Sequence, residues 1–154
     1  MIKQIISLFF VCQLAQAAFD IRDYGAIADE TKVQSEMINA EAFADAIAAA
    51  NATMTEERRV IVPENYTFSC MPINVRYVTN ITIQIDGTLL VSKNHKRYPL
   101  DGSNVYDFLA FQYVQGVKIE GKGSVQGQGF MWWVRELLGR NKNGRPQLPV
   151  FREA

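Results

Sequence analysis

Four carboxylates near predicted strands are the first candidates for acid–base chemistry in this 154-residue sequence. Two carboxyl groups about 6.5–9.5 Å apart can act as general acid and general base in the hydrolysis of a glycosidic bond. The four acids are scattered along the chain, and scattered acids usually cover a solvated surface. We therefore assign no catalytic residue among them; they are Asp86, Asp101, Asp107 and Glu120.

Two aromatic and basic clusters could instead bind a sugar. The rings of Trp132 and Trp133 could stack on sugar rings, although neighbours on a strand point in opposite directions and only one could face a cleft. A role as a packing anchor beneath the loop of residues 140–149 is the favoured alternative. His95-Lys96-Arg97 could contact a polyanion, but long basic side chains are mostly solvated and a solvated loop is favoured.

The remaining motifs argue against metal, phosphate and cofactor chemistry. Residues 121–129 are rich in glycine but lack the Gly-Lys-Ser/Thr sequence of a phosphate-binding loop, so they indicate tight corners between strands. His95 is the only histidine, which makes a histidine-based metal site improbable, and we expect no cofactor. Cys70 is either a buried apolar residue or half of a disulfide.

The composition is that of a globular chain, with 48% hydrophobic and 21% charged residues. Sixteen basic and sixteen acidic residues cancel, and no block of like charge stands out. Nothing in this balance indicates nucleic acid or an acidic membrane surface as the partner. No obligate protein partner is evident from the sequence.

The first residues have the three-part order of a secretory signal peptide. Lys3 precedes an apolar run that ends in Ala15-Gln16-Ala17, and cleavage is expected after Ala17. The apolar run is too short for a membrane anchor. The expected organisation is a signal peptide at residues 1–17 and one domain at 18–154. Three acceptor patterns for N-glycosylation, at Asn51, Asn65 and Asn80, agree with secretion.

These residues must be positioned by one helix and many short strands. A helix is predicted over residues 39–52, with Asn39 as its N-cap, and a second, shorter candidate helix spans 131–138. Residues 78–89 align without a gap with residues 114–125, at an offset of 36. A strand–turn–strand unit repeated at a fixed offset predicts a solenoid. Four apolar side chains are then expected to stack in one core: Ile81, Ile83, Val117 and Ile119.

Several of these stretches resemble a known superfamily. Residues 19–26, the predicted helix and residues 60–63 resemble the N-terminal segment of pectin-lyase-like right-handed parallel β-helices. The glycine pattern of residues 121–129, followed by Trp132-Trp133 and Arg145-Pro146, narrows the resemblance to the polygalacturonases, glycoside hydrolase family 28.

The resemblance implies a mostly β fold, the N-terminal coils of a right-handed single-stranded parallel β-helix with an N-terminal capping helix. It implies a secreted, extracellular glycosidase that hydrolyses galacturonan without a cofactor. Family members carry their catalytic groups on later coils, in Asn-Thr-Asp, Asp-Asp and Gly-His-Gly motifs, with a later Arg-x-Lys. The first three do not occur here, so we expect a fragment without the catalytic aspartates. The alternative is a non-catalytic carbohydrate-binding or surface β-helix module.

Overall fold

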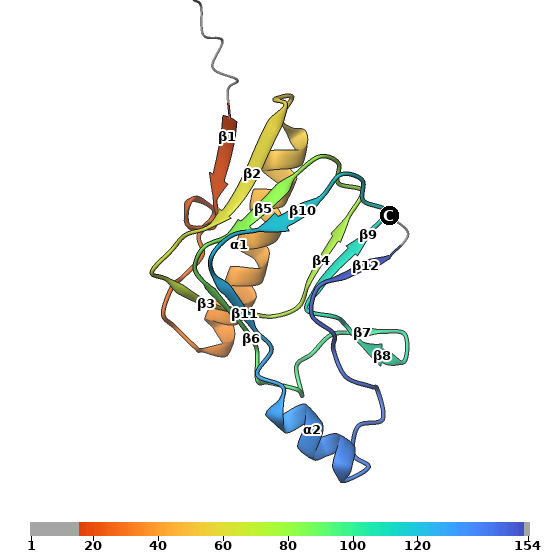
Figure 1. The fold of residues 1–154 in the computed structure, drawn as a ribbon. Helices are drawn as coiled ribbons and strands as arrows, with labels where there is room; N and C mark the ends of the chain where they lie inside the picture. The colour runs from red at the N-terminus through yellow and green to blue at the C-terminus, as the bar shows by residue number, and fades with distance from the viewer. Residues whose placement is uncertain (1–15, 153–154) are drawn as a thin grey trace, which may run out of the picture.

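Three parallel sheets make up most of the structure, a computed structural model that describes residues 16–152 (Figure 1). The first sheet has the order β1 (Gln16–Asp20), β2 (Glu57–Val62), β5 (Thr82–Ile85) and β10 (Lys118–Glu120). The second has the order β3 (Thr67–Cys70), β6 (Thr88–Val91) and β11 (Ser124–Gln126). The third has the order β4 (Ile73–Arg76), β9 (Leu109–Gln112) and β12 (Val150–Arg152).

The chain visits the three sheets in turn, so each circuit adds one strand to each sheet. We call these circuits coils: β2–β3–β4, then β5–β6–β9, then β10–β11–β12. In the third sheet Val150 pairs with Ala110, which is a longer offset because of the second insertion. In the first two sheets the register between the second and third coils is constant, since Ile119 pairs with Ile83 and Val125 pairs with Leu89. Both pairs keep the offset of 36 seen in the sequence. The expected parallel stacking of these strands is therefore confirmed.

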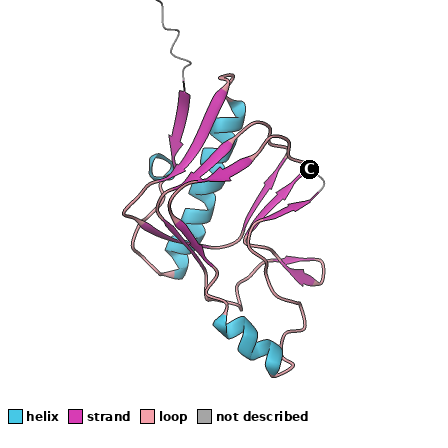
Figure 2. Cartoon of the chain, viewed as in Figure 1, coloured by secondary structure: helices cyan, strands magenta, loops and turns pink. Residues whose placement is uncertain are grey.

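The connection from the second sheet to the third is the one that grows from coil to coil. It is residues 71–72 in the first coil, residues 92–108 in the second and residues 127–149 in the third. We call the last two segments the first and second insertions. The first contains an antiparallel hairpin of β7 (Leu100–Asp101) and β8 (Asn104–Val105), and the second contains α2 (Phe130–Leu137). Both lie at the same end of the molecule, as Figures 1 and 2 show.

The long helix α1 (Val33–Ala52) follows β1 and a short 3-10 helix (Ile21–Tyr24), and it packs against β1, β2, β3 and β4. It begins six residues earlier than predicted, so the assignment of Asn39 as its N-cap is wrong. Asn39 is fully buried within the helix. Its amide accepts a hydrogen bond from the Ile27 N–H at 2.6 Å and donates to the carbonyls of Ile27 and Ser69. A buried amide needs such partners, and residue type alone did not distinguish this role from a cap.

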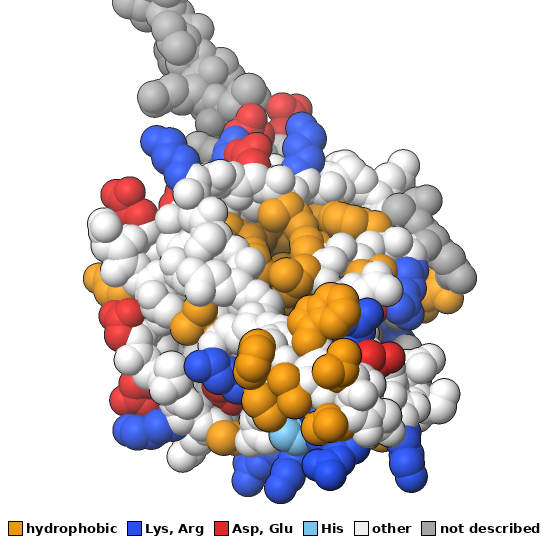
Figure 3. Space-filling view, turned by 60° about the horizontal axis from the view of Figure 1, so that its bottom comes forward, with side chains coloured by type: hydrophobic (Ala, Val, Ile, Leu, Met, Phe, Trp, Pro, Cys, Tyr) orange, Lys and Arg blue, Asp and Glu red, His pale blue; other side chains and the backbone are white. Residues whose placement is uncertain are grey.

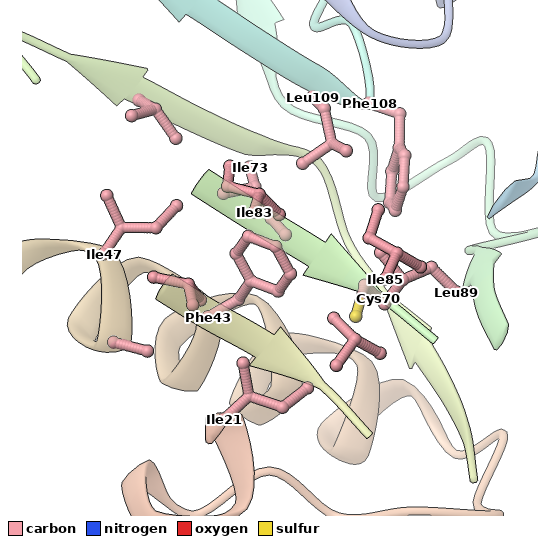
Figure 4. Close-up of a cluster of buried hydrophobic side chains, with 14 of the residues drawn as sticks. Ile21, Phe43, Ile47, Cys70, Ile73, Ile83, Ile85, Leu89, Phe108 and Leu109 are labelled. Atoms are coloured by element: carbon pink, nitrogen blue, oxygen red, sulfur yellow. The ribbon is translucent and has the colours of Figure 1, made fainter. Parts of the chain in front are cut away.

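The core lies between α1 and the three sheets (Figure 4). Ile81 and Ile83 are 1% exposed, and Phe43 and Ile47 of α1 pack into the same cluster. Val117 and Ile119 of the outermost described coil also pack against this core but are only partly buried. The predicted stack of apolar side chains is confirmed, and its burial falls off where no further coil covers it among the described residues.

The corner between the first and second sheets leaves no room for side chains. A Cβ on Gly121, where φ is +131°, would overlap the carbonyl oxygen of Ile85 in the coil beneath. A Cβ on Gly123 would overlap the carbonyl oxygen of Gly87. Glycine is therefore required because the backbones of two coils touch here.

The corner between the third and first sheets uses left-handed backbone at the same two places in both coils. Tyr77 and Tyr113 have φ of 56° and 54°, and Asn80 and Gly116 have φ of 51° and 65°. Such values are unfavourable for tyrosine. The two tyrosine rings stack, with centroids 5.2 Å apart and planes 7° from parallel, which helps to offset the strain.

We expect Gly121→Ala to lower the free energy of unfolding by about 3 kcal/mol, because it adds a clash to an unfavourable φ. The matched control is Gly139→Ala, where φ is +62° but a Cβ would meet no atom within 4 Å. That control should cost about 1 kcal/mol from backbone strain alone. Urea unfolding of both variants measures the difference, and equal losses would contradict the close contact of the coils.

Cys70 is a free, fully buried cysteine in the core, so of the two alternatives the structure favours a buried apolar residue. Burial and the charge of Glu36 raise the pKa of its thiol to about 12. In a Cys12→Ser background, we expect Cys70 to resist a thiol reagent at pH 8 and to react at once in denaturant. Rapid modification of the folded protein would show that the core around Cys70 opens.

Candidate functional site

A pocket of about 480 Å³ opens between the two insertions. Its apolar part is formed by Val91, Phe108 and Leu148, and one side is formed by Trp133 and Arg145. We call it the insertion pocket; Gly127, Gly129, Trp132, Pro146 and Gln147 complete its lining. The size is that of a cleft for a small ligand.

Hydrogen bonds between the two insertions hold the walls of this pocket in place. The N–H of Phe108 donates to the carbonyl of Gln147 at 2.9 Å, and the N–H of Val105 donates to the carbonyl of Asn143 at 3.0 Å. The Nε2 of Gln128 donates to the carbonyl of Val91 at 2.8 Å. Backbone pairing of this kind fixes the two loops relative to each other, so the pocket is largely preformed.

The two adjacent tryptophans have different surroundings. Both lie on α2, so the expectation that they sit on a strand is wrong, while the candidate helix at 131–138 is confirmed. Trp132 is 6% exposed and meets Tyr98 edge to face, with ring centroids 5.1 Å apart. Trp133 is 63% exposed and faces the insertion pocket. One ring is thus the packing anchor and the other is available to a ligand.

Arg145 lies on the exposed tryptophan. Its guanidinium carbon is 4.0 Å from the centroid of the Trp133 ring. The two residues come from opposite ends of the second insertion, so the loop between them returns over α2. The sequence indicated Trp133 as a residue that could stack on a sugar, and Arg145 only as part of a family motif. Nothing in the spacing of the two residues predicts that they touch.

The basic stretch of the first insertion is mostly solvated, as the favoured alternative has it. Lys96 and Arg97 are exposed, whereas His95 is partly buried beside Trp132. Burial lowers the pKa of His95, and the charges of Arg135 and Lys96 lower it further. His95 is therefore held neutral at pH 7 by a positively charged neighbourhood.

The face around the pocket combines apolar and basic side chains (Figure 3). Besides Trp133, the second insertion has five exposed large apolar residues, of which only Leu148 lines the pocket; they are Phe130, Met131, Leu137, Leu138 and Leu148. Between residues 127 and 149 the sequence has four basic residues and one acid, Glu136. This surface is suited to a ligand with apolar faces and negative charge.

The candidate carboxylates tie coils together. Asp107 accepts hydrogen bonds from the N–H of Gln147 at 2.8 Å and from Arg152 at 2.7 Å. Glu120 pairs with Arg59. Each partner lies in another coil, so these two acids are engaged in coil–coil contacts.

Asp86 has the same role at the first corner. Its carboxylate accepts from the Nε2 of Gln84 at 2.5 Å and from the N–H of Lys122 at 3.1 Å. These bonds lower the pKa of Asp86, which keeps it ionised. Asp101 lies in β7, in the hairpin of the first insertion.

Glu36 is a buried acid that the sequence reasoning did not single out. It is 5% exposed on α1 and accepts hydrogen bonds from Ser69 at 3.3 Å and from Ser92 at 2.7 Å. The two serines belong to the first and second coils. Burial raises the pKa of Tyr98, and the charge of Glu36 raises it further. The Tyr98 hydroxyl has no hydrogen-bond partner among the described residues. The cluster links α1 to both coils.

The predicted modification sites fall on corners and at one helix end. Asn65 and Asn80 are exposed. Asn51 lies at the end of α1, where its Nδ2 donates to the carbonyl of Tyr77 and its Oδ1 accepts from the N–H of Thr79, both at 3.3 Å. Residues 1–15 of the expected signal peptide lie outside the described residues, and Ala17 lies in β1.

Three further features of residues 16–152 concern metal-ligating groups, helix length and the glycine-rich run. In that range no group of three or more metal-ligating side chains is present, and neither helix could cross a bilayer. The glycine-rich run forms the corner before β11 and the approach to α2, which connects strands of two different sheets. This is not the βαβ arrangement of a phosphate-binding loop.

Arg-x-Lys is the one motif of the four that does occur, at Arg140-Asn141-Lys142. It lies in the loop after α2, where Asn141 donates to Glu136 at 2.8 Å and the Arg140 carbonyl accepts from Arg135. The family places this motif on a coil beyond the catalytic aspartates, and no such pair accompanies it here. The spacing therefore does not add a catalytic residue.

Comparisons with known proteins identify relatives of the whole described region. The chain is 32% identical to a probable polygalacturonase of Arabidopsis thaliana over 116 residues, 72% of this chain and 26% of the relative. It is 28% identical to a second probable polygalacturonase of the same plant over 151 residues, 95% of this chain and 29% of the relative. It thus spans less than a third of the length of these curated relatives. No solved structure matches the chain significantly.

The family model of the glycosyl hydrolases family 28 matches residues 52–153. This range begins at the end of α1 and covers all three coils together with both insertions. Matches of this extent show that the chain belongs to the glycosyl hydrolases family 28.

Proposed function

We propose that this chain forms the N-terminal coils of a secreted, pectin-degrading polygalacturonase. The observation that carries the proposal is the family match over residues 52–153, on parallel strands stacked in three coils. The reaction of the whole protein is hydrolysis of α-1,4-galacturonan, without an organic cofactor. This stretch supplies substrate-binding surface and structural support for catalytic coils that carry the acid and the base.

The proposed fold is a right-handed single-stranded parallel β-helix, and the proposed role of α1 is to cap its first coil. Only the first sheet has a strand, β1, before the first coil; among the described residues β3 and β4 have no strand on that side. The helix α1 packs against both. An uncovered first coil would expose apolar core and strand edges, and capping removes that exposure.

Secretion is proposed from the sequence of residues 1–17 and from the three glycosylation patterns. Exposure of Asn65 and Asn80 supports glycans at these corners. Cleavage after Ala17 would shorten β1, because Gln16 and Ala17 pair with Glu57 and Arg58 in the unprocessed chain. Three paired residues would remain to hold the strand in the first sheet.

The 154-residue chain should sediment with cross-linked polygalacturonate yet release no reducing sugar from it. General acid and base each contribute about 10²–10⁴-fold to such a reaction, and this stretch lacks the motifs that carry them. Sedimentation with cellulose is the control for non-specific adsorption. Reducing-sugar release that is lost in Asp86→Asn or Glu120→Gln would show that a catalytic pair is present after all.

Material secreted by a eukaryotic host should begin at Ala18 and should gain mobility after treatment with peptide-N-glycosidase. Asn65→Gln and Asn80→Gln should each remove one mobility step, because each asparagine is exposed. N-terminal sequencing and electrophoresis provide the measurements. A first residue of Met1, or no change on enzymatic deglycosylation, would contradict the proposed secretion.

A further inference from the structure

Arg145 has no carboxylate partner, unlike the arginines that form ion pairs in this structure. Arg22, Arg59 and Arg152 form ion pairs with acids. Arg145 forms no hydrogen bond or ion pair with any residue in the range 16–152. Its guanidinium carbon lies over the face of Trp133, 4.0 Å from the ring centroid. All of its N–H donors are therefore available to a ligand in the insertion pocket.

Stacking on Trp133 prepares this arginine for binding. A guanidinium packed on an aromatic ring keeps its planar orientation, and its edge can donate two parallel hydrogen bonds to one carboxylate. A preoriented donor loses less conformational entropy when a ligand binds. Trp133 is itself fixed, because its neighbour Trp132 anchors α2 in the buried contact with Tyr98.

The surroundings of the pair favour an anionic ligand. Arg135, Arg140 and Lys142 belong to the same insertion, and Glu136 is its single acid. Among the residues that line the pocket, Arg145 is the only charged one. A cleft lined by one sign of charge raises the local concentration of ligands of the opposite sign.

The apolar part of the pocket restricts the ligand further. Leu148 lines the pocket with Arg145 and is 41% exposed, so it offers carbon surface, whereas Val91 and Phe108 are buried beneath the pocket. A uronic acid residue has an apolar face of C–H groups and one carboxylate on its ring. It can place this face against Leu148 while its carboxylate reaches Arg145.

The geometry points to a uronate subsite in the insertion pocket, in which Arg145, held on Trp133, binds the carboxylate of one sugar of a polyuronide chain. This inference rests on the proposed function, since it assigns the residues that would distinguish an acidic polysaccharide from a neutral one. Arg145 is a specificity-determining residue here and has no part in bond cleavage.

The test is titration of the full chain with a short oligogalacturonate, its methyl ester and a neutral maltooligosaccharide, by calorimetry. We expect Arg145→Ala to weaken binding of the acid by about tenfold, the loss of one charged bidentate pair, and to leave the weaker binding of the methyl ester unchanged. Trp133→Ala should cause a similar loss for the acid, because the guanidinium loses its support. Arg145→Lys should restore only part of the affinity, because an ammonium lacks the planar pair of donors.

Lys142→Ala is the matched control, since it removes one positive charge from the same loop at a residue outside the pocket lining. It should change the affinity less than twofold. Equal losses of affinity in Arg145→Ala and Lys142→Ala would reduce the effect to general electrostatic attraction. Equal binding of the acid and the methyl ester would show that the carboxylate is not recognised. Either result would overturn the inference. Binding to phosphatidylserine vesicles that is lost in Phe130→Ala, and not displaced by oligogalacturonate, would identify a membrane-contacting face and would also overturn it.

The outcomes separate this inference from the proposed function. If the unaltered chain sediments with polygalacturonate and Arg145→Ala sediments equally well, the subsite is wrong and the proposed function stands. If the unaltered chain binds no galacturonate at all, both fail.

Discussion

Contact between the backbones of successive coils is the constraint on which the other features of this structure depend. At the corner between the first and second sheets, Gly121 lies directly on Ile85 and Gly123 lies on Gly87. Since neither position can carry a Cβ, the two coils have one way to approach each other. That approach sets the register of the first two sheets, and this register brings Ile119 over Ile83 in the core.

The same constraint explains where the candidate binding surface lies. Two of the three connections between sheets are short throughout, with no more than five residues in any described coil. The connection from the second sheet to the third is the exception, and both insertions occur there. Because the coils are stacked, the two insertions are neighbours in space, and their hydrogen bonds build a pocket from segments that are about 36 residues apart in the chain.

Much of the fold could be predicted from the sequence, because the repeat at an offset of 36 specifies both the period and the inward-facing residues. Asn39 was misassigned because an asparagine before a run of helix-forming residues has the same local signature whether it caps a helix or lies buried within it. The start of α1 at Val33 has no side-chain cap, so no capping residue in the sequence marks this end of the helix.

The site was harder to predict than the fold. A stacked pair such as Trp133 and Arg145 depends on the path of the loop between them, which follows from its hydrogen bonds to the first insertion and not from any periodicity. The buried Glu36 was missed for a related reason. Its partners Ser69 and Ser92 lie on different coils, so their proximity is a property of the stack.

The left-handed corners at Tyr77 and Asn80, repeated at Tyr113 and Gly116, have a consequence for how such a chain can change in length. Gain or loss of a single residue within β9 would turn the side chains that follow it in that strand to the opposite face and would separate the stacked tyrosines. Duplication of a whole period would reproduce both corners, the tyrosine stack and the inward-facing isoleucines, and would leave each existing coil as it is. Along the stack, the length of the chain therefore changes by whole coils. Only the insertions can change by single residues, so new loops can evolve there without disturbing the fold that carries them.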